Sequence, residues 1–386
     1  MRAIVNARLH PVSDSVIPDG VLLIDEEGKI AQVGADVQVP EGAEVINADG
    51  RDVTPGIIES HCHAGVSEEG IGWEGSDGNE STHPVTPQVR AIDGANPEDK
   101  AFAAFRAAGV TAAQIMPGSA NIIGGEQFTV KSREAAVIED MVIKHPSGMK
   151  AALGENPKRV YGGKKGPSTR MGNASVMRKW LQKAKEYAEK MDTAEEPSDE
   201  PDFDMKMQAL LPVIRREMPL RIHCHRADDI ATAVRIAEEF DIKFTLEHVT
   251  QGDRVLDLLE EKEVYCAVGP CMVAEAKVEM RGNDFDTAAQ MYEKGIHFCI
   301  TNDHPVVHGR FLRAAAGLLC AWDVPTRHAL KSVTLAAAEH IGVDDRIGSL
   351  EPGKDADLVI WSGDPLDART FADCTFVDGE VVFERE

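Results

Sequence analysis

The stretch Val53-Thr-Pro-Gly-Ile-Ile-Glu-Ser-His61-Cys-His63-Ala-Gly65 carries the strongest structural signal in this chain. An apolar run follows a Pro-Gly turn and ends in two histidines spaced i, i+2, which predicts a buried strand with both imidazoles at its end. Side chains alternate between the two faces of a strand, so His61 and His63 share one face and Cys62 takes the other. Two histidines on one face are half of a metal site, and other segments must supply the remaining ligands.

Length and charge limit the class of protein. With 386 residues, of which 43% are hydrophobic, the chain is long enough for a large α/β barrel and a small accessory domain. Its formal net charge of −24 argues against nucleic acid and anionic membrane surfaces as partners, because both are negatively charged. We therefore expect a small-molecule substrate, no nucleic acid and no membrane.

Cysteine usage and the first residues indicate a compartment. The seven cysteines are scattered and include no C-x-x-C pair, as is usual for reduced thiols. Residues 1–10 lack the apolar core of a signal peptide, and no apolar run reaches about 18 residues. These features predict a cytoplasmic protein; a homo-oligomer is compatible with them.

Both ends of the chain have the sequence pattern of short β-strands separated by turns, for example residues 20–25 and a hairpin around Asp378-Gly379. Neither end is large enough to bury a core alone. We expect residues 1–54 and 346–386 to form one composite β-sandwich domain.

Between them, over residues 55–345, strands alternate with helices, as in a parallel sheet or barrel. The predicted fold class is α/β: a (β/α)8 TIM-type barrel with a small β-sandwich domain built from both chain termini. An acidic run at 192–204 predicts a solvated surface insertion.

Several predicted barrel strands end on a side chain that can bind a metal: Glu155, His223 or His225, His248 and Asp303. The C-terminal ends of barrel strands meet at one mouth, so ligands far apart in sequence converge there. A lone strand histidine is more often a hydrogen-bonded core residue than a ligand. The repetition at the same end of successive strands predicts a metal site.

With these residues in view, the sequence resembles the amidohydrolase superfamily of metal-dependent hydrolases, and in overall texture the branch around imidazolonepropionase. The motifs that carry the resemblance are Thr54-Pro-Gly-Ile-Ile-Glu-Ser-His61-Cys-His63, Arg221-Ile-His223-Cys-His225, Leu246-Glu-His248 and Thr301-Asn-Asp303-His-Pro, with two further signatures at 329–342 and 346–358. The resemblance covers nearly the whole chain but is poorly specific for a substrate.

The resemblance implies a binuclear metal centre. His61 and His63 would bind the more buried metal, and His223 and His248 the second. Glu155 would stand where the family places a bridging carboxylate, which is either a glutamate or a carbamylated lysine. Zinc is the first expectation, and Mn, Fe and Ni also accept such ligands.

The same resemblance makes Asp303 a metal ligand and the catalytic proton shuttle. A metal lowers the pKa of bound water from about 15.7 to about 7, so hydroxide is available at neutral pH to attack a carbonyl. Asp303 would take the proton and return it to the leaving nitrogen. We expect hydrolysis of an amide or cyclic amide in a small N-acyl or amino-acid-like substrate, anionic substrates included.

Two ligand assignments stay open at this point. His223 and His225 share a strand face, so spacing does not choose between them; the family pattern favours His223 and leaves His225 nearer the substrate. Lys150 is an alternative, carbamylated bridge. Its place at the beginning of the predicted strand, and its opposite parity, favour Glu155.

Loops that follow barrel strands carry specificity and supply further candidates. The basic loop 158–170 contains Lys164 and Arg170 and either holds a substrate carboxylate or phosphate or is a solvated loop. Asn121 begins a Gly-rich segment that lines the site or forms a tight turn. His304 is adjacent to Asp303 and is a candidate to touch substrate.

Three other functions compete with this one. A mononuclear deaminase of a nucleobase-like ring usually has a Glu two or three residues beyond the fifth-strand His, whereas Arg226-Ala-Asp228 follows here. A prolidase-type dipeptidase is compatible with the sequence. A non-catalytic amidohydrolase-like assembly protein would have lost ligands, and this chain retains them.

Overall fold

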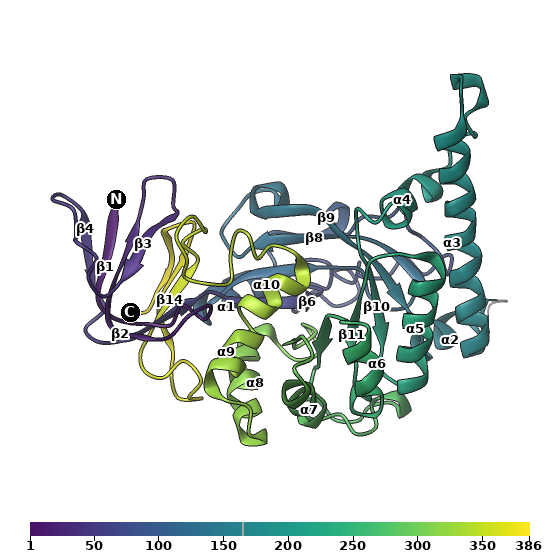
Figure 1. The fold of residues 1–386 in the computed structure, drawn as a ribbon. Helices are drawn as coiled ribbons and strands as arrows, with labels where there is room; N and C mark the ends of the chain where they lie inside the picture. The colour runs from purple at the N-terminus through teal and green to yellow at the C-terminus, as the bar shows by residue number, and fades with distance from the viewer. Residues whose placement is uncertain (164–165) are drawn as a thin grey trace.

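Two eight-stranded β-sheets organise the molecule (Figure 1). The computed structural model describes residues 1–163 and 166–386. One sheet combines strands from both chain termini, and the other is built from the segment between them.

The terminal sheet has the strand order β16-β15-β14-β5-β1-β2-β3, with β4 also paired to β1. Its strands are β1 (Arg2–Leu9), β2 (Ile17–Ile24), β3 (Ile30–Gly34), β4 (Glu44–Asn47), β5 (Asp52–Pro55), β14 (Leu358–Trp361), β15 (Ala372–Val377) and β16 (Glu380–Glu384). Antiparallel pairing of β14 with β5 joins the two ends of the chain. Ile4, Leu22, Leu358 and Phe376 belong to a separate apolar core at this sheet. The termini thus share one sheet and one core, while the two-layer sandwich and the domain limits stay predictions.

The second sheet is the barrel, in the order β13-β12-β11-β10-β9-β8-β7-β6. Its strands are β6 (Ile57–Cys62), β7 (Val110–Ile115), β8 (Ile123–Lys131), β9 (Val142–Ala152), β10 (Leu220–Cys224), β11 (Phe244–His248), β12 (Cys266–Val268) and β13 (Phe298–Ile300). A parallel bridge between Cys62 and His304 brings the end of β6 beside the segment that follows β13. The sheet therefore closes in the manner of the predicted TIM-type barrel, with β6 and the end of the β13 segment adjacent.

One strand departs from the expected (β/α)8 pattern. β8 runs antiparallel to both β7 and β9. The connections 116–122 and 132–141 contain no α-helix, and short connections of this kind join antiparallel neighbours rather than parallel ones. The strict alternation is interrupted here, and β9 is longer than the sequence suggested.

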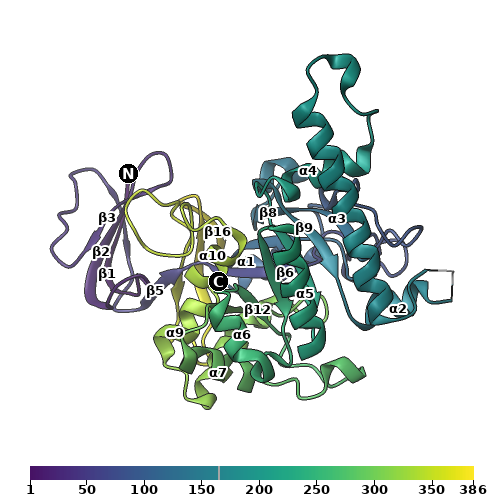
Figure 2. The same cartoon turned by 45° about the vertical axis from the view of Figure 1, so that its right-hand side comes forward.

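The helices are α1 (Lys100–Ala107), α2 (Glu155–Tyr161), α3 (Arg170–Thr193), α4 (Met205–Ile214), α5 (Ala227–Phe240), α6 (Leu256–Glu261), α7 (Asp286–Lys294), α8 (Leu312–Leu319), α9 (Thr326–Ser332) and α10 (Leu335–Ile341). α3 projects well beyond the barrel (Figure 2). The acidic segment 192–204 begins in the last turn of α3 and is mostly exposed, as predicted. Residues 1–163 and 166–386 contain no helix with the length and apolar character that crossing a bilayer requires.

A buried lysine ties the barrel to the terminal sheet. Lys131, at the end of β8, is inaccessible to solvent and lies 2.7 Å from Asp355 and 3.0 Å from Asp357, with Asp378 as a third partner. Burial favours the neutral amine, but the aspartates outweigh it and raise the pKa of Lys131. Removing this cation would leave the buried Asp357 without its cationic partner, while Asp355 keeps Lys29 and Arg346.

We expect Lys131→Met to lower the free energy of unfolding by about 3–5 kcal/mol, because it breaks a buried ion-pair group from one side. The control is Lys29→Met, which removes a half-exposed partner of the same Asp355 and should cost about 0–1 kcal/mol. Urea denaturation measures both values. Equal and small losses in the two variants would contradict the buried role of Lys131.

Candidate metal centre

Two clusters of metal-competent side chains lie at the ends of the barrel strands. His61, His63 and Asp303 form one, and His223, His225 and His248 form the other. Within each cluster, the candidate ligand atoms are within 4.8 Å of one another. The structure therefore brings together the residues of β6, β10 and β11 and of the turn after β13 that the sequence singled out.

The two clusters are in contact. The ring centroids of His61 and His248 are 4.6 Å apart, and those of His223 and His248 are 4.4 Å apart. Oδ1 of Asp303 is 3.6 Å from Nε2 of His61 and 3.2 Å from Nε2 of His63. The two clusters therefore adjoin each other through His61 and His248, while the other distances hold each cluster together.

Hydrogen bonds fix the tautomers of the candidate ligands. Nδ1 of His61 faces the Glu247 carboxylate at 2.9 Å, and Nδ1 of His63 and of His248 face backbone carbonyls at 2.7 and 2.8 Å. A ring nitrogen opposite an acceptor carries the proton, which leaves the Nε2 lone pair free. Each of these three histidines is therefore prepared to bind a cation through Nε2.

Orphaned buried atoms also fit a cation. In the described part of the chain, Nδ1 of His223 and Oδ1 of Asp303 are buried without a hydrogen-bond partner, although such atoms are nearly always satisfied. Burial, with a contribution from Lys150, lowers the pKa of His61 to about 3. Burial likewise lowers the pKa of His223 and His248. The site thus holds neutral imidazoles, the protonation state that metals bind.

The bridging position is where the structure differs most from the prediction. Glu155 begins α2 and its backbone N–H donates to Glu279 at 2.8 Å; it belongs to neither cluster. Lys150 is fully buried, and its Nζ lies 3.0 Å from Nε2 of His61. Burial lowers the pKa of Lys150 to about 8, against the influence of nearby carboxylates.

Register and strand length explain this difference. β9 begins at Val142 and ends at Ala152, so Lys150 is near its C-terminal end and not at its beginning. Lys150 pairs with Arg221, two residues before His223, and therefore shares the inward face of that histidine. Gly154, with φ of 84°, then turns the chain into α2 before Glu155.

The clusters open into a cavity of about 340 Å³. Its lining includes the predicted residues His63, His223, His225 and Asp303, together with Ser119, Asn156, Arg159 and Lys277. The Nδ1 of His225 pairs with the Thr250 hydroxyl at 2.8 Å, and its ring stacks on His248 at 4.8 Å. His225 is thus placed beside the ligands, where the sequence expected a substrate contact.

Three other candidates lie outside the lining of this cavity among the described residues. Asn121 is buried, accepts from the Tyr161 hydroxyl at 2.7 Å and donates to Thr86 at 2.6 Å, so it fastens loops together. Arg170 pairs with Asp229 at 2.9 Å. His304 is buried beside the Phe105 ring, and Lys164 lies outside the described residues.

A third cluster, Glu69, His304 and His308, has the composition of a metal site but the wrong tautomers. Nδ1 of His304 accepts the backbone N–H of Gly309 at 3.4 Å, and Nδ1 of His308 accepts that of Arg310 at 3.1 Å. Both Nε2 atoms therefore carry protons, and Nε2 of His308 faces the Glu69 carboxylate at 2.9 Å. This cluster is held by backbone N–H groups at Nδ1 and by the charge contact between His308 and Glu69.

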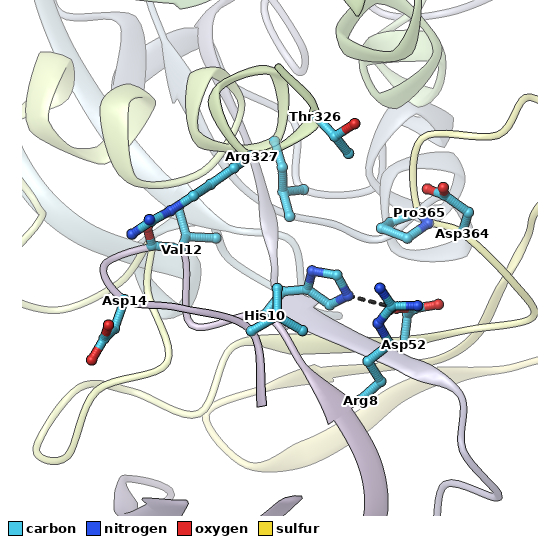
Figure 3. Close-up of a pocket in the computed structure, with 11 residues that line it drawn as sticks. Arg8, His10, Val12, Asp14, Asp52, Thr326, Arg327, Asp364 and Pro365 are labelled. Carbon is cyan, nitrogen blue, oxygen red and sulfur yellow. Dashed lines mark hydrogen bonds and ion pairs between the residues drawn. The ribbon is translucent and has the colours of Figure 1, made fainter. Parts of the chain in front are cut away.

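A second cavity, of about 360 Å³, lies between the terminal sheet and α9 (Figure 3). His10 pairs with Asp52 there, Arg8 lies beside them, and Arg327 extends from α9 on the opposite side. Its charges are mixed, and in the described chain none of the groups able to hold a metal lines it. Of the two cavities, only the barrel cavity is lined by a candidate metal cluster among the described residues.

Two buried residues that the sequence did not single out form a chain of contacts to the candidate ligand His61. Glu247 is fully buried and faces Nδ1 of His61 on one side and Nε2 of His340 at 3.0 Å on the other. His340 lies in α10, within the signature at 329–342. The adjacency of Glu247 to His248 in its motif was the available signal.

Comparison with known proteins agrees with this geometry. Residues 53–382 match the amidohydrolase family. The chain belongs to this family. The predicted resemblance is therefore confirmed, and it places this amidohydrolase among enzymes that hydrolyse carbon–nitrogen bonds.

Individual relatives span the whole barrel. The crystal structure of an amidohydrolase from Thermotoga maritima is 40% identical, with a TM-score of 0.96 over 100% of both chains. The amidohydrolase tasK of Hapsidospora irregularis is 30% identical over 90% of this chain, which spans only 38% of the length of that protein. The imidazolonepropionase of Cupriavidus taiwanensis is 24% identical over 89% of this chain and 85% of its own.

We expect Glu247→Gln to weaken metal binding by about 10- to 100-fold, because an amide cannot accept from both His61 and His340. Glu339→Gln is the matched control, since Glu339 pairs with His297 at 2.6 Å away from the cavity. Competition with a chromogenic chelator measures both affinities. Unchanged affinity in Glu247→Gln would show that the carboxylate does not orient His61.

Proposed function

We propose that this amidohydrolase is a binuclear metal enzyme that cleaves the C–N bond of an amide or cyclic amide in a small N-acyl or amino-acid-like molecule. The observation that carries the proposal is the pair of touching clusters, in which His61, His63 and His248 keep a free Nε2 lone pair. Imidazole and carboxylate donors of this kind suit zinc, and also Mn, Fe or Ni.

His61, His63 and Asp303 would hold one metal, and His223 and His248 the other. His223 would bind through its orphaned Nδ1, because its Nε2 lies 3.5 Å from the Asn156 amide nitrogen. The Nδ1 of His225 is paired with a hydroxyl, so that ring offers Nε2 instead, and the family pattern is what favours His223 as the ligand. When bound, the metal pair supplies an activated water and polarises the substrate carbonyl.

Asp303 is the proposed proton shuttle. It lines the cavity while its carboxylate stays close to His61 and His63. Burial opposes ionisation, but the nearby imidazoles of His63, His248 and His61 outweigh it and hold the pKa of Asp303 below its ordinary value. The ionised carboxylate accepts a proton from water and delivers it to the leaving nitrogen. His225, beside it in the cavity, orients the substrate.

We also propose Lys150, in place of Glu155, as the residue that joins the two metals after carbamylation. Its amine reacts with CO2 to give a carbamate and releases one proton, which creates a carboxylate on the end of a buried side chain. Support comes from the contact of Nζ with Nε2 of His61 and from the register that turns Lys150 inward.

Lys150→Met should lower bound metal from about two ions per chain to about one, while Glu155→Ala should leave the count unchanged, because only Lys150 contacts a ligand histidine. Elemental analysis after dialysis against metal-free buffer measures the count. The reverse pattern, with metal lost only in Glu155→Ala, would restore Glu155 as the bridge.

The proposed activity predicts hydrolysis that depends on metal. Metal-depleted and metal-restored protein should be assayed against N-acyl amino acids, cyclic amides, dipeptides and nucleobases. We expect turnover of amides or cyclic amides only after restoration, and its loss in Asp303→Asn. Ammonia released from nucleobases, with one metal per chain, would support the deaminase alternative instead.

A further inference from the structure

Two cations converge on one neutral oxygen at the wall of the active-site cavity. Nη2 of Arg159 donates to Oδ1 of Asn156 at 3.5 Å, and Nζ of Lys277 donates to the same atom at 3.2 Å. All three residues line the cavity. Arg159 comes from α2 and Lys277 from the loop after β12, so two separate barrel loops bring positive charge to one place.

The orientation of the Asn156 amide is fixed. Its Nδ2 donates to the hydroxyl of Ser119 at 2.7 Å and lies 3.5 Å from Nε2 of His223. The oxygen therefore faces the cations, and the nitrogen faces the metal cluster. Asn156 is only 9% exposed, so the exposed Arg159 and the half-buried Lys277 both contact a buried side chain.

The charge of this pair is only partly neutralised within the protein. Lys277 pairs with the buried Glu279 at 2.8 Å. Glu279 also lies 4.0 Å from Arg170 and accepts the backbone N–H of Glu155. Arg159 has no carboxylate within ion-pair distance among the described residues. In a chain of net charge −24, an unpaired arginine beside a lysine in the active-site cavity marks a place for an anion.

We infer that Arg159 and Lys277 form a subsite for the carboxylate of the substrate, next to the metal cluster at His223. The inference rests on the proposed amidohydrolase function and names its substrate class: N-acyl amino acids or cyclic amides that carry a carboxylate.

Geometry favours a carboxylate that is close to the scissile bond. A guanidinium presents parallel N–H groups that match the two oxygens of a carboxylate, and the ammonium adds a third donor. Asn156 contacts both cations on one side and His223 on the other. A substrate whose carboxylate lies at the cations and whose carbonyl lies at the metal cluster would therefore have only a few bonds between these two groups. A volume of about 340 Å³ is at the small end for ligand pockets and suits a molecule of amino-acid size.

The subsite replaces the pair that the sequence suggested. Arg170 is engaged by Asp229 at 2.9 Å, and it is not among the described residues that line the cavity. Lys277 comes from the loop after β12, outside the basic loop altogether. The predicted anion-binding loop thus contributes Arg159, with the second cation supplied from across the cavity.

The test uses metal-restored protein and probes that differ only in the carboxylate. N-acetyl-L-leucine is compared with N-acetyl-L-leucinamide, and dihydroorotate with dihydrouracil. Calorimetry measures binding, and steady-state kinetics measures kcat and KM where turnover occurs. We expect the carboxylated member of at least one pair to bind more tightly. Its affinity should fall about tenfold or more in Arg159→Ala and Lys277→Ala, with the neutral member unaffected.

The matched control is Arg178→Ala, which removes an arginine of α3 that pairs with Glu239 outside the cavity. This substitution should leave the affinity for both the carboxylated and the neutral probe unchanged. Metal content is measured in every variant, so that a loss of affinity is not a loss of metal.

The outcomes separate the two proposals. Equal binding of charged and neutral members in the wild-type protein, or no effect of either substitution, overturns the subsite even if neutral amides are hydrolysed. Selective binding of carboxylates that depends on Arg159 and Lys277 upholds the subsite, even if no probe is hydrolysed and the amidohydrolase function fails.

Discussion

The hydrogen bonds that hold a proton on Nδ1 of the ligand histidines are the interaction on which this structure depends. They come from different elements: a carboxylate of β11 for His61 and backbone carbonyls for His63 and His248. Each bond fixes a ring orientation and frees the nitrogen that faces the cavity. The same criterion separates the metal clusters from Glu69, His304 and His308, where backbone N–H groups occupy Nδ1 and leave protonated nitrogens inside. Composition alone makes the clusters look alike; proton placement distinguishes them.

The backbone beneath the site is held in unusual conformations to present these atoms. His248 and Asp303 have φ of 74° and 53°, a region that non-glycine residues rarely adopt. Thr301 and the backbone N–H of Asn302 donate to Glu59, a buried carboxylate of β6 whose pKa burial raises to about 8. The first barrel strand thus supports the turn that carries Asp303. Local strain of this kind persists only where surrounding contacts determine it.

Much of the candidate site was predictable from two simple rules. Side chains alternate between the faces of a strand, and the C-terminal ends of barrel strands meet at one end of the barrel. These rules placed His61 with His63, added His248 and Asp303, and excluded Cys62. The rules failed at Lys150 because they depend on where a strand begins and on its register with its neighbour. β9 is extended by antiparallel pairing with β8, a feature that periodicity does not reveal. They also failed for Asn121 and Arg170, whose partners within the protein hold them outside the lining of the cavity. The anion site predicted for the basic loop stays a prediction; the proposed subsite takes Arg159 from that loop and Lys277 from a loop with no basic signature.

Anomalous diffraction at the absorption edge of the bound metal, from crystals of protein purified without chelators, tests the central claim most directly. This account predicts two peaks, one in contact with His61, His63 and Asp303 and the other in contact with His223 and His248, with none beside Glu69. No peak at either cluster, or a peak beside Glu69, His304 and His308 alone, would contradict it.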